Sequence, residues 1–426
     1  MNNITKYLKK NFLVSSSKTV VTSLVTLLLL PLIIERLGLK LYGIISLTLL
    51  FSGTSSLIDL GLSKAVILLS NKTSENKIIS SALYINLIII SILTIPFILL
   101  QLLSVDLLGS HLNIDKTNKF LILNTGFLLL TLMLLNNLCK AILESKYKVH
   151  IVNLTLAIYT PTLYTIIFVL SFFTEQCITY ILTPFVLTLL MLLFNIIYIK
   201  QHTTIKIIKV TKKDLKHVIK KSLAFLNIGL INSMIMPIMR YAFVILVADV
   251  GLYAIFDLSF KIAMLANSFI LSLATPMFAV FSKEIQENSR KMIQVSYRIF
   301  YISTALYLTT TLAYYLFGSY FLTFLNISSK NLDLLYNITF LLIISLGSVA
   351  LVEIFYRYFL ANNQLIKAFL LKLIVPIIGL MLFFVFKGID LIYRFIYAYG
   401  TGLIISAIAI ALSFMIYNKN KISIKI

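Results

Sequence analysis

The chain of 426 residues has no tryptophan, only two cysteines and four histidines, and 15 acidic residues against 37 basic ones. Two cysteines, Cys139 and Cys177, cannot form a disulfide framework, and no C-x-x-C motif or His/Cys cluster predicts a metal site. The G-x-S-x-G, P-loop and H-E-x-x-H motifs are also missing. We therefore expect no cofactor, no metal and no enzymatic chemistry, and we interpret both cysteines as packing residues.

Charged residues are scarce as well. Only 12% of the residues are charged and 60% are apolar, and whole windows of about 20 residues carry no charge. This composition excludes an ordinary soluble domain and indicates an integral membrane protein. Continuous runs such as LVTLLLLPLII exclude a membrane barrel, whose strands alternate in polarity. The first apolar run continues to Ile34 without a cleavage site, so we expect a retained span rather than a signal peptide.

The apolar windows that are long enough to cross about 30 Å of hydrocarbon predict an all-α, polytopic membrane protein with twelve transmembrane helices. We place these spans at 12–34, 41–63, 78–103, 117–139, 149–173, 177–199, 223–248, 252–282, 292–317, 335–361, 366–386 and 391–417.

The basic residues of the connections alternate between many and few. With the N terminus inside, the inner segments hold 24 lysines and arginines and the outer segments hold 5. The positive-inside rule therefore predicts an N-in, C-in topology. The same bias accounts for most of the net charge of +22, so we expect no nucleic-acid partner.

The longest polar stretch, residues 200–222, separates two halves of similar length. It predicts an N-terminal lobe at 1–199, a basic cytoplasmic linker at 200–222 and a C-terminal lobe at 223–426. Within the linker, DLKHVIKK has apolar side chains on one helical side and lysines around them, which favours an interfacial helix on the anionic inner leaflet.

The two halves repeat each other at an offset of 211 residues. LYGIISL at 41–47 matches LYAIFDL at 252–258 in four of seven positions, and Lys9-Lys10 matches Lys220-Lys221. A parallel repeat of this kind predicts two pseudo-symmetric six-helix lobes with the substrate route between them.

Ionisable side chains inside spans cost free energy, so they usually face a cavity or a partner. In the first span the polar residues, Lys18, Thr22 and Thr26 among them, lie within an arc of about 140°. In the second span Ser52, Ser56 and Asp59 lie on another polar face. Two interpretations stay open: a water-filled cavity, or close packing through interhelical hydrogen bonds.

The seventh and eighth spans carry further candidates. Asn232, Ser233 and Arg240 share a face of the seventh, where Arg240 either lines the route or extends to the outer interface. In the eighth, Asp257 and Lys261 are i,i+4 neighbours that either neutralise each other or serve the route, and Asn267 lies further along. Glu353 and Arg357 form a second i,i+4 pair, and for Lys372 we expect an interfacial position.

Residues 37–66, LGLKLYGIISLTLLFSGTSSLIDLGLSKAV, resemble the signature of O-antigen flippases, the Wzx-type polysaccharide-transporter branch of the multidrug/oligosaccharidyl-lipid/polysaccharide (MOP) exporter superfamily. Its LG-x-x-x-YG lead is followed by a D-x-G-x-x-x-A-like end of the second helix, here Asp59 to Ala65. The predicted twelve helices, two lobes, basic linker and second GLYAI at 251–255 extend the resemblance along the chain.

The resemblance implies a MATE-like fold in the bacterial inner membrane and a flippase, not an enzyme. The implied substrate is an undecaprenyl-pyrophosphate-linked oligosaccharide, moved by alternating access to the periplasmic leaflet. The implied partners are membrane lipids and other O-antigen assembly proteins, such as a polymerase and a chain-length regulator. Candidates to hold the pyrophosphate are Lys18, Lys64, Arg240 and Lys261, those for ion coupling are Asp59 and Asp257, and those lining the cavity are Thr22, Thr26, Ser52, Ser56, Asn232, Ser233 and Asn267.

Two alternatives remain. A cation-coupled multidrug exporter of the same superfamily typically uses an acidic residue in the first helix, whereas this helix has Lys18 and no carboxylate before Glu35. A membrane-embedded polysaccharide polymerase would need a large outer loop, and no predicted outer connection exceeds roughly 20 residues.

Overall fold

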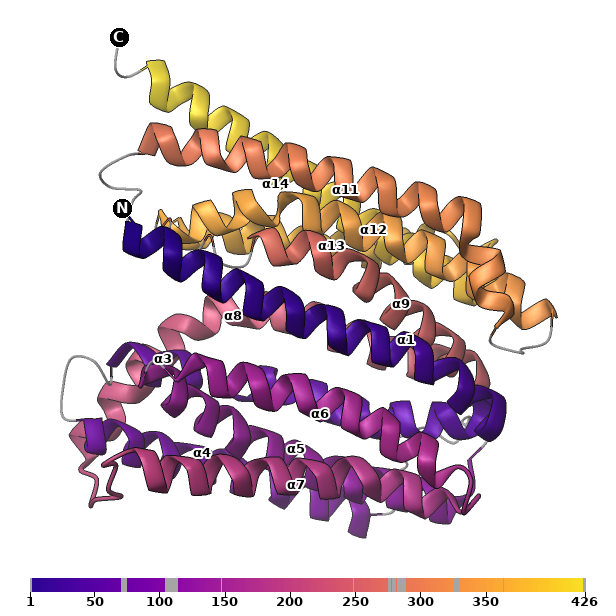
Figure 1. The fold of residues 1–426 in the computed structure, drawn as a ribbon, viewed down its shortest axis with the longest axis horizontal. Helices are drawn as coiled ribbons and strands as arrows, with labels where there is room; N and C mark the ends of the chain where they lie inside the picture. Colours follow the sequence, from indigo (N-terminus) through magenta and orange to yellow (C-terminus); the bar gives the residue numbers. More distant parts are fainter. Residues whose placement is uncertain are drawn as a thin grey trace. The chain divides into compact units, whose positions relative to one another are not determined.

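The computed structural model describes residues 2–69, 75–103, 114–146, 148–247, 249–274, 277, 281, 289–324, 329–362 and 364–423; at 2–20, 224–239 and a few other positions the description covers the backbone alone. The described residues are mostly helical and include no strand. The helices are α1 Asn2–Gly53, α2 Ser55–Ile58, α3 Leu62–Leu69, α4 Glu75–Leu102, α5 Lys116–Ser145, α6 Val149–Leu170, α7 Cys177–His202, α8 Lys212–Val247, α9 Val250–Ala274, α11 Ser289–Thr323, α12 Ser329–Ala361, α13 Leu365–Val385 and α14 Leu391–Ser423 (Figure 1).

The predicted class, an all-α polytopic membrane protein, is confirmed. In the described part of the chain nine helices are long and apolar enough to cross a membrane: α4, α5, α6, α7, α9, α11, α12, α13 and α14. Most predicted spans correspond to one of these helices. The described residues do not reproduce the number twelve: α1 covers the first predicted span and part of the second, and α8 joins part of the linker to the seventh.

The first two predicted spans meet at Gly38, where α1 bends. Gly38 has a positive φ of 73° and lies in a non-helical conformation inside α1. Glycine adopts this backbone region without steric cost, so the LG pair allows the chain to change direction here.

The second predicted span, 41–63, is wrong as one continuous helix. Helix α1 ends at Gly53, the short α2 follows, and the backbone leaves the helical region at Leu60 (φ 51°) and Gly61 (φ 76°) before α3 begins. Two consecutive residues with positive φ cannot continue a right-handed helix. The D-x-G part of the motif therefore forms a break between two helices.

By its contacts the chain divides into two compact units, one of Leu28–Ala254 and one of Met1–Leu27 with Ile255–Ile426. In the first unit α7 packs against α5 and α6, and α8 packs against α3 and α4; in the second, α14 packs against α12 and α13 and α11 packs against α12 (Figure 1). These limits differ from those of the predicted lobes. The division at the linker therefore stays a prediction.

Buried polar side chains join neighbouring helices of the first unit. The Asn195 side chain on α7 donates a 2.6 Å hydrogen bond to Asn136 on α5, and Asn86 on α4 donates to the Leu134 carbonyl at 3.1 Å. All three asparagines are buried. Interhelical hydrogen bonds of this kind hold helices together where lipid supplies no hydrophobic driving force.

Candidate functional site

The repeated LY motif creates a close helix crossing within the first unit. A Cβ atom on Gly43 would lie 2.5 Å from the Val250 carbonyl oxygen and 3.3 Å from the Ala254 Cβ. Position 254 is the 211-residue equivalent of position 43. The small residue after each tyrosine therefore lets the first turn of α9 approach α1 just after its bend at Gly38, and the contact joins equivalent positions of the predicted repeat.

Arg240 on α8 lies beside this crossing. Its Nη2 donates to the Tyr253 hydroxyl at 3.4 Å, and that hydroxyl donates to the Ser46 carbonyl at 3.5 Å. Arg240 is half-buried, whereas Tyr253 is completely buried. Both tyrosines of the repeat, Tyr42 and Tyr253, are core residues. The sequence did not identify Tyr253 as a contact of Arg240, although the repeated motif drew attention to this residue.

The Asp59 side chain caps α3 at the break between α2 and α3. Its carboxylate accepts a 3.0 Å hydrogen bond from the Ser63 backbone N–H and a 2.9 Å bond from the Ser63 hydroxyl. A side-chain acceptor at this place satisfies a donor that the first turn of α3 leaves without an intrahelical partner. Lys64, one residue further, is exposed. Ser52, another candidate from the second predicted span, is half-buried and donates a hydrogen bond to the Leu49 carbonyl at 2.6 Å.

The second unit contains the other candidates that the structure describes. Lys261 Nζ lies 2.7 Å from the Asp257 carboxylate, which is completely buried, so the predicted i,i+4 pair exists. Asn267 is buried and donates to the Ala263 carbonyl at 2.9 Å, in a close packing contact between α9 and α12. Thr26 is buried and Thr22 half-buried. The side chains of Lys18, Ser56, Asn232 and Ser233 lie outside the described residues.

The sequence missed a buried charge cluster in this unit. We expected Lys372 on α13 to extend to the membrane interface, but this residue is only 5% exposed. Its Nζ lies 4.0 Å from the Glu353 carboxylate on α12. Glu353 also accepts a 3.1 Å hydrogen bond from Arg357, as the i,i+4 spacing predicted. The Lys372 ammonium lies 4.8 Å from the centre of the Tyr356 ring. Burial of Lys372 was not predictable, because Glu353 is far from it in sequence.

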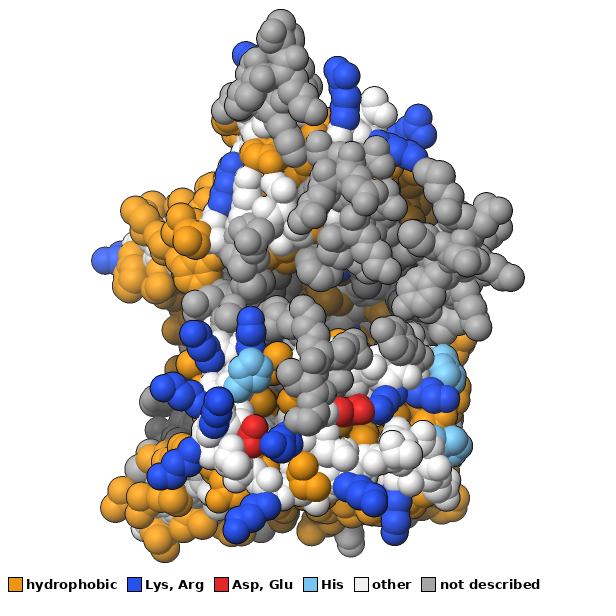
Figure 2. Space-filling model, turned by 90° about the vertical axis from the view of Figure 1, so that its left-hand side faces the viewer, with side chains coloured by type: hydrophobic (Ala, Val, Ile, Leu, Met, Phe, Trp, Pro, Cys, Tyr) orange, Lys and Arg blue, Asp and Glu red, His pale blue; other side chains and the backbone are white. Residues whose placement is uncertain are grey.

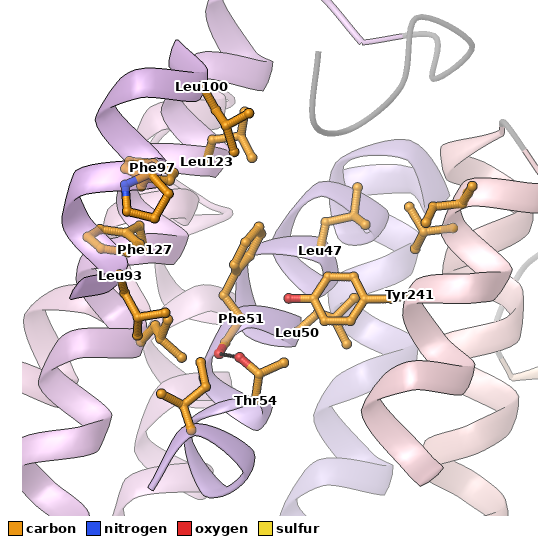
Figure 3. Close-up of a pocket in the computed structure, with 15 residues that line it drawn as sticks. Leu47, Leu50, Phe51, Thr54, Leu93, Phe97, Leu100, Leu123, Phe127 and Tyr241 are labelled. Atoms are coloured by element: carbon orange, nitrogen blue, oxygen red, sulfur yellow. Dashed lines mark hydrogen bonds between the residues drawn. The ribbon is translucent and has the colours of Figure 1, made fainter. Parts of the chain in front are cut away.

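An apolar cavity of about 420 Å³ opens in the first unit between α1, α4, α5 and α8. In Figure 3, Leu47, Leu50 and Phe51 line it from α1, Phe97 and Phe127 form the opposite wall, and Tyr241 closes it from α8. Among its fifteen lining residues only Thr54 and Tyr241 carry polar side-chain atoms. Thr54 donates to the Phe51 carbonyl at 2.7 Å. Such walls suit an apolar ligand.

Comparison with known proteins identifies the fold of this chain. No family model and no curated protein matches the sequence. Among solved structures, an inward-facing MATE-family multidrug resistance transporter of the MOP superfamily is similar over 97% of this chain and 98% of its own, with TM-score 0.74 and 15% identity. The lipid II flippase MurJ, in an inward closed conformation, is similar over 94% of this chain and 87% of its own, with TM-score 0.75 and 16% identity.

A MOP superfamily transporter from Pyrococcus furiosus, whose binding pocket has reversed polarity, is similar over 96% of this chain and 94% of its own, with TM-score 0.59 and 15% identity. At these identities the likeness establishes the fold alone. The predicted MATE-like fold is confirmed over nearly the whole chain.

Proposed function

We propose that this protein is a membrane transporter that flips undecaprenyl-pyrophosphate-linked oligosaccharides, the repeat units of O-antigen or a related polysaccharide, to the periplasmic leaflet of a bacterial inner membrane by alternating access. The observation that carries this proposal is the whole-chain likeness to a fold whose solved examples are transporters, one of them a lipid II flippase.

The charges of the membrane helices favour an anionic, lipid-linked substrate within this fold. The first predicted span carries Lys18 and no carboxylate, and Arg240 lies half-buried on α8 beside Tyr253. A pyrophosphate needs charged donors in a site of low dielectric constant, where charge-assisted hydrogen bonds are strong. Arginine suits this task because its planar guanidinium donates in pairs. We also propose that Lys64 and Lys261 bind the pyrophosphate.

The motif at 37–66 supports the finer assignment to O-antigen units. The bend at Gly38, the crossing at Gly43 and the break at Leu60 and Gly61 give structural reasons for the LG, YG and D-x-G residues of the motif. The Asp59 and Asp257 carboxylates remain candidates for ion coupling, and we propose Ser52 and Thr22 as lining residues. Membrane lipids and the other assembly proteins of the polysaccharide remain proposed partners.

The test is a flipping assay in proteoliposomes with a fluorescent undecaprenyl-pyrophosphate oligosaccharide. We expect the protein to move the label between leaflets much faster than protein-free vesicles do, as measured by quenching with a membrane-impermeant reductant. In cells, Lys18→Gln should abolish surface O-antigen while the amount of protein in the membrane stays unchanged. A flipping rate equal to that of empty vesicles would overturn the proposal.

The apolar cavity of the first unit supports a second candidate, a cation-coupled multidrug exporter. Its walls of Phe51, Phe97, Phe127 and Tyr241 suit lipophilic aromatic cations. This function predicts gradient-driven efflux of ethidium from cells that express the protein. The flippase predicts no ethidium efflux, so the two assays together separate the candidates.

A further inference from the structure

A second, polar groove of about 590 Å³ lies between the first turns of α4 and α8, within the unit 28–254. Four lysines line it, one from α4 and three from α8, together with one histidine and one carboxylate: Lys77, Lys213, Lys216, Lys220, His217 and Asp214. Figure 2 shows Lys and Arg side chains gathered over this end of the helices. None of these residues belongs to the proposed transport site.

The groove is held in shape by contacts that do not involve its lysine side chains. Residues 203–210, which lead into α8, are held to the start of α4: the Lys206 N–H donates to Asn76 at 3.1 Å and the Ile208 N–H donates to Ser80 at 2.9 Å. From α8, Val218 is buried in a core cluster with Leu62 and Ile78. The two walls are therefore fixed relative to each other.

The charge of the groove is positive and largely uncompensated. In the described part of the chain none of the four lysines forms an ion pair. Asp214 accepts hydrogen bonds from the Thr211 N–H at 3.1 Å and from the Thr211 hydroxyl at 2.6 Å, which lowers the pKa of this carboxyl. This carboxylate therefore caps the first turn of α8. One engaged carboxylate cannot neutralise four ammonium groups, so the groove is suited to an anion.

The groove continues directly into an apolar surface. Along α4, Lys77 and Ser81 line the groove, and Tyr84 and Ile88 follow at i+7 and i+11 on the same helix face. Tyr84 is 54% exposed and Ile88 is 42% exposed. On α8 the exposed Ile219 lies next to Lys220. Exposed apolar side chains on a membrane helix face acyl chains, so the groove lies at the level of the lipid head groups.

We propose that this groove binds the phosphate of an anionic membrane lipid, with an acyl chain along the exposed face of α4 through Tyr84 and Ile88. The basic linker places the site on the cytoplasmic leaflet, where anionic lipids concentrate beside clusters of lysines. The apolar continuation distinguishes a lipid from free phosphate, which would gain nothing from it. The groove is lined by none of the residues proposed for transport, and the lipid site does not rest on the proposed function.

The experiment is native mass spectrometry of the full-length protein in detergent, titrated with dioleoyl phosphatidylglycerol, dioleoyl phosphatidylcholine or inorganic phosphate. The groove variant is Lys77→Gln/Lys216→Gln/Lys220→Gln. The matched control, Lys206→Gln/Lys209→Gln/Lys221→Gln, removes the same charge from exposed lysines that do not line the groove. We expect the groove variant to bind phosphatidylglycerol at least tenfold more weakly than the parent protein, and the control to bind within twofold of it.

A second variant, Tyr84→Gln/Ile88→Gln, tests the acyl contact. It should weaken phosphatidylglycerol binding while leaving any weak binding of inorganic phosphate unchanged. Thermal unfolding in detergent establishes that each variant is folded. Equal losses in the groove and control variants, equal binding of the two phospholipids, or phosphate binding as tight as lipid binding would each overturn the proposal.

Discussion

At the scale of single residues, Arg240 is the described candidate best placed to act on a charged substrate. Its guanidinium is half-buried and is positioned by the Tyr253 hydroxyl, which is itself held by the Ser46 carbonyl. A hydrogen bond to a charged group is worth about 1.5–3 kcal/mol. We therefore expect Arg240→Gln to lower the flipping rate at limiting substrate by about tenfold or more, as measured in proteoliposomes.

Two further variants separate charge from position at this site. Arg240→Lys keeps the charge and loses the paired donors, so its rate should lie between those of the parent and Arg240→Gln. Tyr253→Phe removes only the positioning hydroxyl and should cost less than Arg240→Gln. If Arg240→Gln flips substrate at the parent rate while inserting normally, Arg240 has no part in transport.

The Lys372 cluster gives a prediction about stability. Breaking a buried ion pair by removing one partner costs about 3–5 kcal/mol, because the other charge stays buried. Glu353→Gln should therefore lower the midpoint of thermal unfolding in detergent, and Glu353→Gln/Lys372→Met should recover much of the loss. Arg357 is partly exposed and can extend outward when Glu353 is neutral. A double variant less stable than Glu353→Gln alone would contradict this account.

Residue contacts were predictable from the sequence where they are local. The pairs Asp257–Lys261 and Glu353–Arg357 follow from i,i+4 spacing, and the structure contains both. The burial of Lys372 and the contact between Arg240 and Tyr253 depend on which faces of separate helices meet. A hydrophobicity pattern gives the depth of a side chain along its helix, but not the helix that it faces.

At the scale of elements, the crossing at Gly43 allows a sharp test. A Cβ atom there would meet the Val250 carbonyl oxygen at 2.5 Å, and this backbone atom cannot move aside cheaply. Overpacking of this kind costs about 1–3 kcal/mol or more. Gly43→Ala should therefore lower the unfolding midpoint in detergent. Gly53→Ala is the matched control, because nothing lies within 4 Å of its Cβ position, and it should leave the midpoint unchanged or raise it. Equal midpoints for the two variants would exclude the close crossing.

Element boundaries were predictable where glycine and apolar length agree, as at Gly38 and through α4 to α7. They were not predictable at residues 59–61, where the apolar pattern continues through a break in the helix. The break depends on two residues with positive φ and on the bonds between Asp59 and Ser63. In hydropathy a capped break inside an apolar run looks like continuous helix, so the apolar pattern predicted one span across residues 41–63.

At the scale of the whole molecule, composition and length alone predicted the fold class, because a membrane forces every backbone polar group into helices or a closed barrel. The offset of 211 residues brought positions 43 and 254 to attention before the structure showed them in contact. The candidate side chains are divided between the two contact units: Arg240, Asp59, Lys64 and Ser52 lie in one, and Thr22, Thr26, Asp257, Lys261 and Asn267 in the other. Spacing in the sequence cannot say which of them bind one substrate together.

Membrane orientation is the whole-molecule property on which the lipid site and the direction of transport both depend. The 24 basic residues of the predicted inner segments against 5 outside predict that Lys209 faces the cytoplasm and Lys330 the periplasm. The chain has only two cysteines, so Cys139→Ser/Cys177→Ser provides a background for single-cysteine labelling. In intact cells Lys330→Cys should react with an impermeant maleimide, and Lys209→Cys should react only after permeabilisation. The reverse pattern would place the linker lysines outside, away from the cytoplasmic leaflet assigned to the bound lipid.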